Sequence, residues 1–216
     1  METRADPPPG NGRNWQELVV TVLLVVAALG TSWSSYQATR WNGEQAKASG
    51  AVNKARIDAA RASGLANAQQ QIDVATFMQW VDSYARGDTK LDIFYRTRFR
   101  PEFTPAFDAW LATRPLKTKG APLTPFAMPE YQLAARADAE RLDQTAEALS
   151  AQVRRDIQRS SNYVLGVVLF AVALFFAGMS TKLTAGGLRK AVLAVGCILF
   201  VGTVAWIATF PVSVAV

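Results

Sequence analysis

Three long apolar segments divide the chain. The first, LVVTVLLVVAALGTSWSS at 18–35, contains no charged residue, and two more follow at 163–179 and 191–210. Each is close to the roughly 20 residues that an α-helix needs to cross a bilayer. The pattern therefore predicts three transmembrane helices, at 17–36, 162–181 and 191–211.

A different repeat follows the first span and precedes the second. In 37–86, small and apolar residues alternate in steps of four and three, a spacing typical of a coiled-coil seam. The seam comprises Trp41, Gln45, Ala48, Val52, Ala55, Ala59, Ala62 and Ala66, and it gains bulk towards its end with Ile72, Phe77, Trp80, Val81 and Tyr84. A second seam, in 129–161, comprises Ala135, Ala139, Leu142, Ala146, Leu149, Val153 and Ile157. The two segments predict a pair of stalk helices that form an antiparallel hairpin, each continuous with a span.

The segment between the stalk helices, 87–128, holds most of the large apolar residues outside the spans. A short helix is predicted before Pro101, and a second is predicted to start at Pro101-Glu102, since proline and an acid favour a first helical turn. The same reasoning starts the second stalk helix at Pro129-Glu130. We therefore expect a small, aromatic-rich helical cap at 87–128, which ends in a proline-pinned loop.

The ends of the apolar segments bear on topology. Residues 1–16, which include PPPGNG, are predicted to be a disordered tail. The first span is predicted to be an uncleaved anchor, although Ala28-Leu29-Gly30 resembles a small-residue cleavage site. The short loop at 182–190 carries three basic residues and no acid, so the positive-inside rule places it and the N-terminus in the cytoplasm. The 37–161 region then lies on the opposite side of the membrane. A nearly equal number of basic residues flanks the spans on that side, and their charge opposes this orientation.

The fold class that follows is an all-α integral membrane protein with three transmembrane helices and a long antiparallel helical hairpin, capped by a small aromatic-rich helical region. The chain has 216 residues, a formal net charge of +6 and no histidine. Without imidazole, Ser-His-Asp and Cys-His nucleophile systems and histidine metal sites are excluded. Phosphate-binding glycine loops and calcium loops are also absent from the sequence, and the single Cys197 lies in the third apolar segment. No catalytic, cofactor or metal site is predicted, and the chain is not expected to be an enzyme.

The most distinctive polar motif is FYRTRFR at 94–100, in which arginines alternate with aromatic residues. Such a surface can bind acidic or phosphorylated partners through charge and cation–π contacts. The alternative is that the aromatic rings pack inward while the arginines pair with Asp92, Glu102 and Asp108. The candidate partner-binding residues are Tyr95, Arg96, Arg98, Arg100 and Trp110.

Four segments resemble a set of uncharacterised bacterial multi-pass inner-membrane proteins. They are WNGEQA at 41–46, FYRTRFRPEFTPAFDAWLATRPL at 94–116, PFAMPEY at 125–131 and NYVLGVVLFAVALFFAGMSTKL at 162–183. The resemblance implies a bacterial, multi-pass inner-membrane protein. In such a membrane the orientation expected from the positive-inside rule places the 37–161 region in the periplasm. The resemblance assigns no activity and no functional residue.

The function expected from these observations is that of a non-catalytic membrane scaffold or accessory protein. Its partners would be the lipid bilayer and either another protein or further copies of itself, with no nucleic acid and no small-molecule substrate. One alternative is a membrane sensor whose stalk transmits a shift at the cap to the spans. Another is a pore-forming subunit, which would gate at a hydrophobic constriction because the three apolar segments contain no charged residue.

Overall fold

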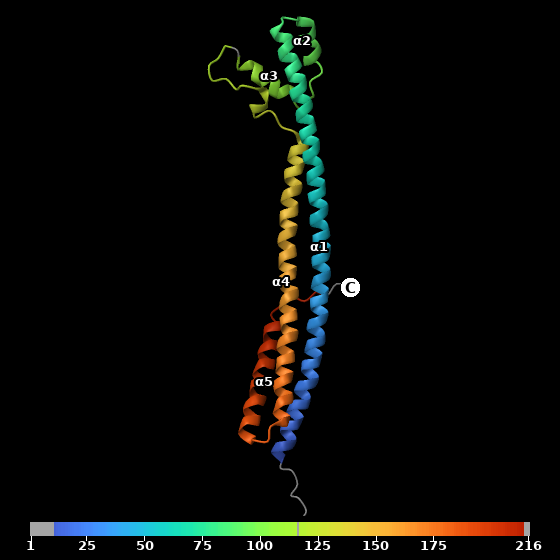
Figure 1. The fold of residues 1–216 in the computed structure, drawn as a ribbon, viewed down its shortest axis with the longest axis vertical. Coiled ribbons are helices and arrows are strands. Elements are labelled where there is room, and N and C mark those ends of the chain that lie inside the picture. Colours follow the sequence, from blue (N-terminus) through green and yellow to red (C-terminus); the bar gives the residue numbers. More distant parts are fainter. Residues whose placement is uncertain (1–10, 116, 214–216) are drawn as a thin grey trace, which may run out of the picture. The chain divides into compact units, whose positions relative to one another are not determined.

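The computed structural model describes residues 11–115 and 117–213 (Figure 1). Over these residues the fold is entirely helical. The elements are α1 (Asn11–Ala85), α2 (Thr89–Arg96), α3 (Thr104–Ala112), the 3-10 helix η1 (Pro125–Ala127), α4 (Ala134–Lys182) and α5 (Gly186–Ile207). The predicted all-α class is confirmed.

The chain divides into two compact units. We call Gly50–Ser150 the cap unit, and the described parts of Met1–Ser49 and Ala151–Val216 the span unit. α1 and α4 each contribute residues to both units, whereas α2 and α3 belong to the cap unit and α5 to the span unit.

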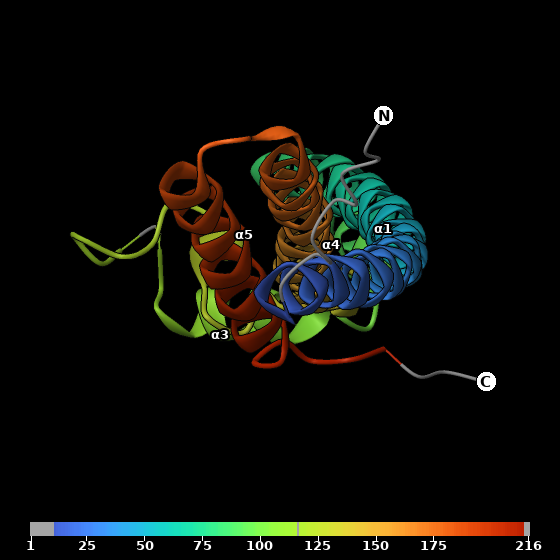
Figure 2. The same cartoon turned by 90° about the horizontal axis from the view of Figure 1, so that it is seen from below.

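Three helices, α1, α4 and α5, contain segments long and apolar enough to cross a membrane. In the span unit their contacts depend on glycines. A Cβ added to Gly30 of α1 would lie 2.7 Å from the Phe170 ring of α4, and one added to Gly196 of α5 would lie 3.3 Å from the backbone of Ala173 in α4. Small residues therefore let the three apolar helices lie side by side (Figure 2).

Within the span unit, α1 and α4 run antiparallel. The Ser160 hydroxyl donates to the Ala38 carbonyl at 3.1 Å, whereas Gly30, earlier in α1, faces Phe170, later in α4. The same two helices are also linked inside the cap unit, where Arg136 donates to the Gln70 side chain at 2.8 Å.

The start of α1 differs from the prediction. The disordered tail was predicted over 1–16; residues 1–10 lie outside the described part, but α1 begins at Asn11. Pro9 is the last proline before the apolar segment, so nothing in 11–16 prevents helix formation. Further along, α1 passes through Trp33–Trp41 without interruption, which agrees with the predicted continuity of the first span and the segment after it.

Two predicted helix starts in the cap unit are wrong by a few residues. α3 begins at Thr104, with Pro105 in the first turn, rather than at Pro101-Glu102. α4 begins at Ala134 rather than at Pro129-Glu130. Glu102 lies near the first expected start and Tyr131 near the second, and each forms a tertiary contact that is described below. The backbone at both places forms turns instead of helix. The basic loop predicted at 182–190 is also shorter, because α4 ends at Lys182 and α5 already begins at Gly186.

Most of the predicted seam is buried, but four positions are wrong. Ile72 and Ile157 are exposed, whereas their neighbours Asp73 and Asp156 are almost completely buried. Val81 and Tyr84, also assigned to the seam, are exposed as well. At 72 and 157 the reason is geometric. Strict steps of three and four from Ala66 lead to position 73, and a step of three from Val153 leads to position 156.

Candidate interaction site in the cap unit

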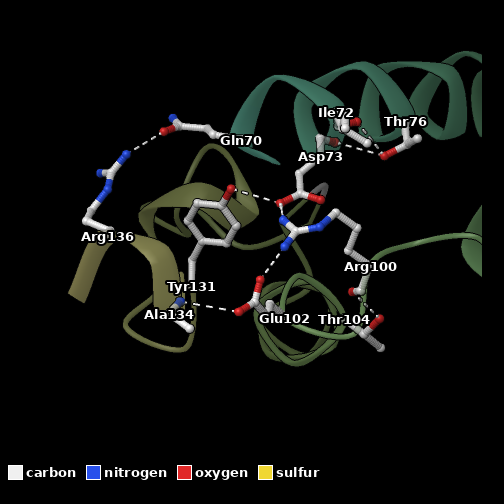
Figure 3. A network of polar contacts seen from close by, with 10 residues as sticks. All are labelled: Gln70, Ile72, Asp73, Thr76, Arg100, Glu102, Thr104, Tyr131, Ala134 and Arg136. Carbon is white, nitrogen blue, oxygen red and sulfur yellow. Dashed lines mark hydrogen bonds and ion pairs between the residues drawn. The ribbon is translucent and has the colours of Figure 1, made fainter. Parts of the chain in front are cut away.

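The centre of the site is a carboxylate buried in the helix seam. Asp73 of α1 is 0% exposed. Its Oδ2 accepts a hydrogen bond from Arg100 Nη1 at 2.9 Å and another from the Tyr131 hydroxyl at 3.0 Å (Figure 3). Its Oδ1 is buried with no hydrogen-bond partner among the described residues. Charge-assisted hydrogen bonds of this kind are what make burial of a carboxylate tolerable.

Arg100 and Glu102 extend the network to the start of α4. The Arg100 guanidinium also forms an ion pair with Glu102. Glu102 Oε1 in turn accepts a hydrogen bond from the backbone N–H of Ala134 at 3.2 Å, the first residue of α4 (Figure 3). The first N–H groups of a helix have no partner within the helix and carry partial positive charge. Glu102 therefore caps α4 from a distant part of the chain.

The network shifts the protonation equilibria of its members. Burial raises the pKa of Asp73 above its ordinary value, although the hydrogen bond from Tyr131 and the charge of Arg100 oppose the shift. Burial also raises the pKa of Tyr131, and the charge of Asp73 raises it further. Tyr131 consequently keeps its proton and acts as a donor. Since Asp73 has no exposed surface, its chemistry here is to position neighbouring segments and not to meet a substrate.

An aromatic core supports this network. It comprises Phe77, Trp80, Phe99, Phe103, Phe107 and Trp110, all buried, with rings that meet mostly edge to face. Offset and edge-to-face pairs add to the stabilisation from apolar burial. The core residues come from the end of α1, the turn after α2, and α3, so the three segments form one packed body.

Two of the five predicted partner-binding residues belong to this core and its edge. Trp110 is only 6% exposed and its indole N–H donates to the Pro122 carbonyl at 2.8 Å. Tyr95 is partly buried against the same cluster. Their rings are therefore engaged in packing within the chain.

The three predicted arginines have different surroundings. Arg100 is internal, with 21% of its side chain exposed. Arg96 is about half exposed, pairs with Asp108 at 2.8 Å and lies over the Phe107 ring. Arg98 is exposed, places its guanidinium 3.5 Å from the centre of the Phe94 ring and donates to the Phe94 carbonyl. Only Arg96 and Arg98 present charge on the surface.

Neither Asp73 nor Tyr131 was predicted to be a member of a site. The signal available for Asp73 was its position, since an acid on the continued four-three repeat must be buried if the repeat continues. For Tyr131 there was no comparable signal, because its partner lies far away in the sequence. No cluster of three or more potential metal ligands occurs among residues 11–115 and 117–213.

The chain was also compared with known proteins. No family model, curated protein or solved structure matches it. The case for a function therefore depends on the site itself.

Proposed function

We propose that the chain is a non-catalytic, membrane-anchored scaffold or accessory protein whose cap unit recognises a protein partner through Arg96 and Arg98. The observation that supports this most is the division among the arginines. Arg100 is used internally to hold the cap together, whereas Arg96 and Arg98 project from the same short segment and remain exposed.

The arrangement favours an acidic partner surface. Arg98 is held against the face of Phe94, itself an exposed aromatic ring, so a partner would meet a cation and an apolar surface that are already ordered. Cation–π contact and pre-organisation both reduce the conformational entropy lost when a long side chain binds. Arg96 would exchange its half-exposed pairing with Asp108 for a partner carboxylate.

The proposal includes a location. The apolar parts of α1, α4 and α5 would span a bacterial inner membrane, with the basic residues around 182–190 in the cytoplasm and 37–161 in the periplasm as an antiparallel hairpin with its cap. Lys182, Arg189 and Lys190 remain clustered at the α4–α5 connection, which supports this orientation. The partner would be another protein or a second copy of the chain.

The test is capture of partners by the full chain in detergent extracts. Arg96→Gln/Arg98→Gln should reduce capture about tenfold or more, since charged anchors in an interface commonly contribute over 1 kcal/mol each. Arg100 is left intact because its loss would disturb the fold. Lys54→Gln/Arg56→Gln removes the same charge from exposed positions on α1 of the same unit and should leave capture unchanged. Equal capture by both double variants would contradict the proposal.

A second candidate function is sensing, and one observation favours it. α1 is a single helix that contributes to both units, and a Cβ on Gly50 or Gly64 would meet nothing within 4 Å. Glycine weakens a helix interior by about 1 kcal/mol relative to alanine. Both positions are therefore points of flexibility, and close packing does not require a glycine at either. If partner binding leaves hydrogen exchange in 163–207 unchanged, the sensor function is excluded and the scaffold remains.

A further inference from the structure

A groove lies beside the aromatic core of the cap unit. Its volume is about 310 Å³, at the lower end of the range of roughly 300–1,000 Å³ found for small-molecule sites. The end of α1, helix α3 and the turn after α3 form its walls. The lining residues that matter below are Trp80, Tyr84, Trp110, Leu111, Arg114 and Lys117.

The floor of the groove is apolar and fixed. Trp80 and Trp110 are 5% and 6% exposed, and their rings meet at 82° with centroids 6.2 Å apart. The hydrogen bond from Trp110 to Pro122 fixes the orientation of one indole, and Tyr84 stacks on the other at 5.2 Å. A flat or slender apolar ligand would find this surface already formed.

The rim of the groove is cationic. Arg114 and Lys117 are both exposed, and no acidic residue lines the groove. Among the described residues neither side chain forms an ion pair, whereas Arg96 and Arg100 each pair with a carboxylate. Two unpaired cations beside an apolar floor are complementary to a ligand that has an apolar body and one anionic end.

The backbone of Arg114 gives a second reason to assign a role to its side chain. It follows the C-cap of α3 with φ of 51°, in the left-handed region, which few residues other than glycine adopt. Helices commonly end with glycine at this position. Chain reversal alone would be served better by glycine, so the guanidinium is present at a conformational cost.

We propose that this groove binds a small amphipathic carboxylate, with its aromatic or aliphatic body on Trp80 and Trp110 and its carboxylate between Arg114 and Lys117. The site is separate from Arg96 and Arg98 and does not depend on the function proposed above. Sequence alone predicts no small-molecule site, because the lining residues come from separate segments and match no motif.

The test uses the full chain in nanodiscs and 4-phenylbutyrate as the probe. Saturation-transfer NMR reports ligand contact, and empty nanodiscs of the same lipid give the signal from partitioning. The variants are Arg114→Gly and Lys117→Gln, alone and combined. Lys119→Gln is the matched control, because it removes a nearby cation that does not line the groove. The neutral analogue 4-phenylbutan-1-ol isolates the contribution of charge.

We expect a saturation-transfer signal that depends on the protein. The affinity for 4-phenylbutyrate should fall at least tenfold in the combined variant and remain unchanged in Lys119→Gln. Arg114→Gly should lose affinity while its melting temperature stays the same or rises, which separates binding from folding. Arg96→Gln/Arg98→Gln should bind the probe normally. The proposal is overturned if the probe gives no signal above empty nanodiscs, if the combined variant binds like the wild type, or if the neutral alcohol binds as tightly.

Discussion

Asp73 links α1 to Arg100 and Tyr131 within the cap unit. It is fully buried at a seam position, and two donors reach the same carboxylate oxygen. Removal of charge-paired donors from a buried carboxylate is costly because the remaining charge has no compensation. An equivalent pair on the surface contributes little, since water already solvates both groups.

Replacement of Arg100 should therefore be far more damaging than the same replacement of Arg96. Arg100→Gln leaves Asp73 with Tyr131 alone, and we expect a loss of about 3 kcal/mol in the free energy of unfolding. Arg96→Gln breaks a half-exposed pair with Asp108 and should cost no more than about 1 kcal/mol. Denaturant unfolding of the full chain in detergent, followed by tryptophan fluorescence, measures both. Similar losses for the two variants would show that the Asp73 network is not structural.

The raised pKa of Asp73 predicts a direction for pH dependence. The folded protein holds a proton on Asp73 at pH values where the unfolded chain, with a pKa of about 4, has lost it. The resulting stability is fully present below the unfolded pKa and is lost as pH rises through the folded one. Asp73→Asn does not titrate, so the wild type should gain stability relative to it as pH falls from about 7 towards 4.5. A relative loss on acidification would mean that Arg100 and Tyr131 outweigh burial.

At the scale of elements, glycine determines how closely the apolar helices approach. Gly196 of α5 faces the backbone of Ala173 and Ala177 in α4, whereas Gly202 of the same helix has open space around it. A backbone neighbour cannot move aside as the end of a side chain can. The two glycines therefore offer the same substitution in two environments.

Gly196→Val should destabilise the span unit by about 1–3 kcal/mol, the usual cost of overpacking. Gly202→Val should be neutral or slightly stabilising, since any residue other than proline favours the helix over glycine. The midpoint of thermal unfolding of the full chain in detergent gives the comparison. If both variants unfold at the same temperature, α5 does not pack on α4 through Gly196.

The helices show which features the sequence can predict. The apolar segments and the four-three repeat identify α1, α4 and α5, because burial along a helix must follow its period. The prediction is wrong at 72 and 157, because the acids at 73 and 156, and not the apolar residues beside them, lie on the strict four-three spacing. Helix geometry decided which residue was buried, and hydrogen-bond partners then made the acid acceptable.

The starts of α3 and α4 could not have been predicted from local signals. Pro101-Glu102 and Pro129-Glu130 both have the composition of a first turn, but Glu102 binds Arg100 and the Ala134 N–H, and Tyr131 binds Asp73. These partners lie in other segments of the chain. The division among Arg96, Arg98 and Arg100 was unpredictable for the same reason, since only the position of Asp73 distinguishes them.

The whole molecule combines three helices that are long and apolar enough to cross a membrane with a cap unit that presents exposed arginines. The described residues include no metal-ligand cluster, and the buried carboxylate is used for structure. The function that we propose for the molecule is recognition of a partner through the exposed Arg96 and Arg98. It is also the claim most open to direct test.

That test is photo-crosslinking in intact cells, with identification of the products by mass spectrometry. The probe is placed at Ile93, an exposed residue of α2 in the same segment as Arg96 and Arg98. A matched probe at Gln144, exposed on α4, reports random encounters. We expect a discrete protein product from the Ile93 probe that is absent with the Gln144 probe and is lost in Arg96→Gln/Arg98→Gln. The same products from both positions, or a product that persists in the double variant, would contradict it.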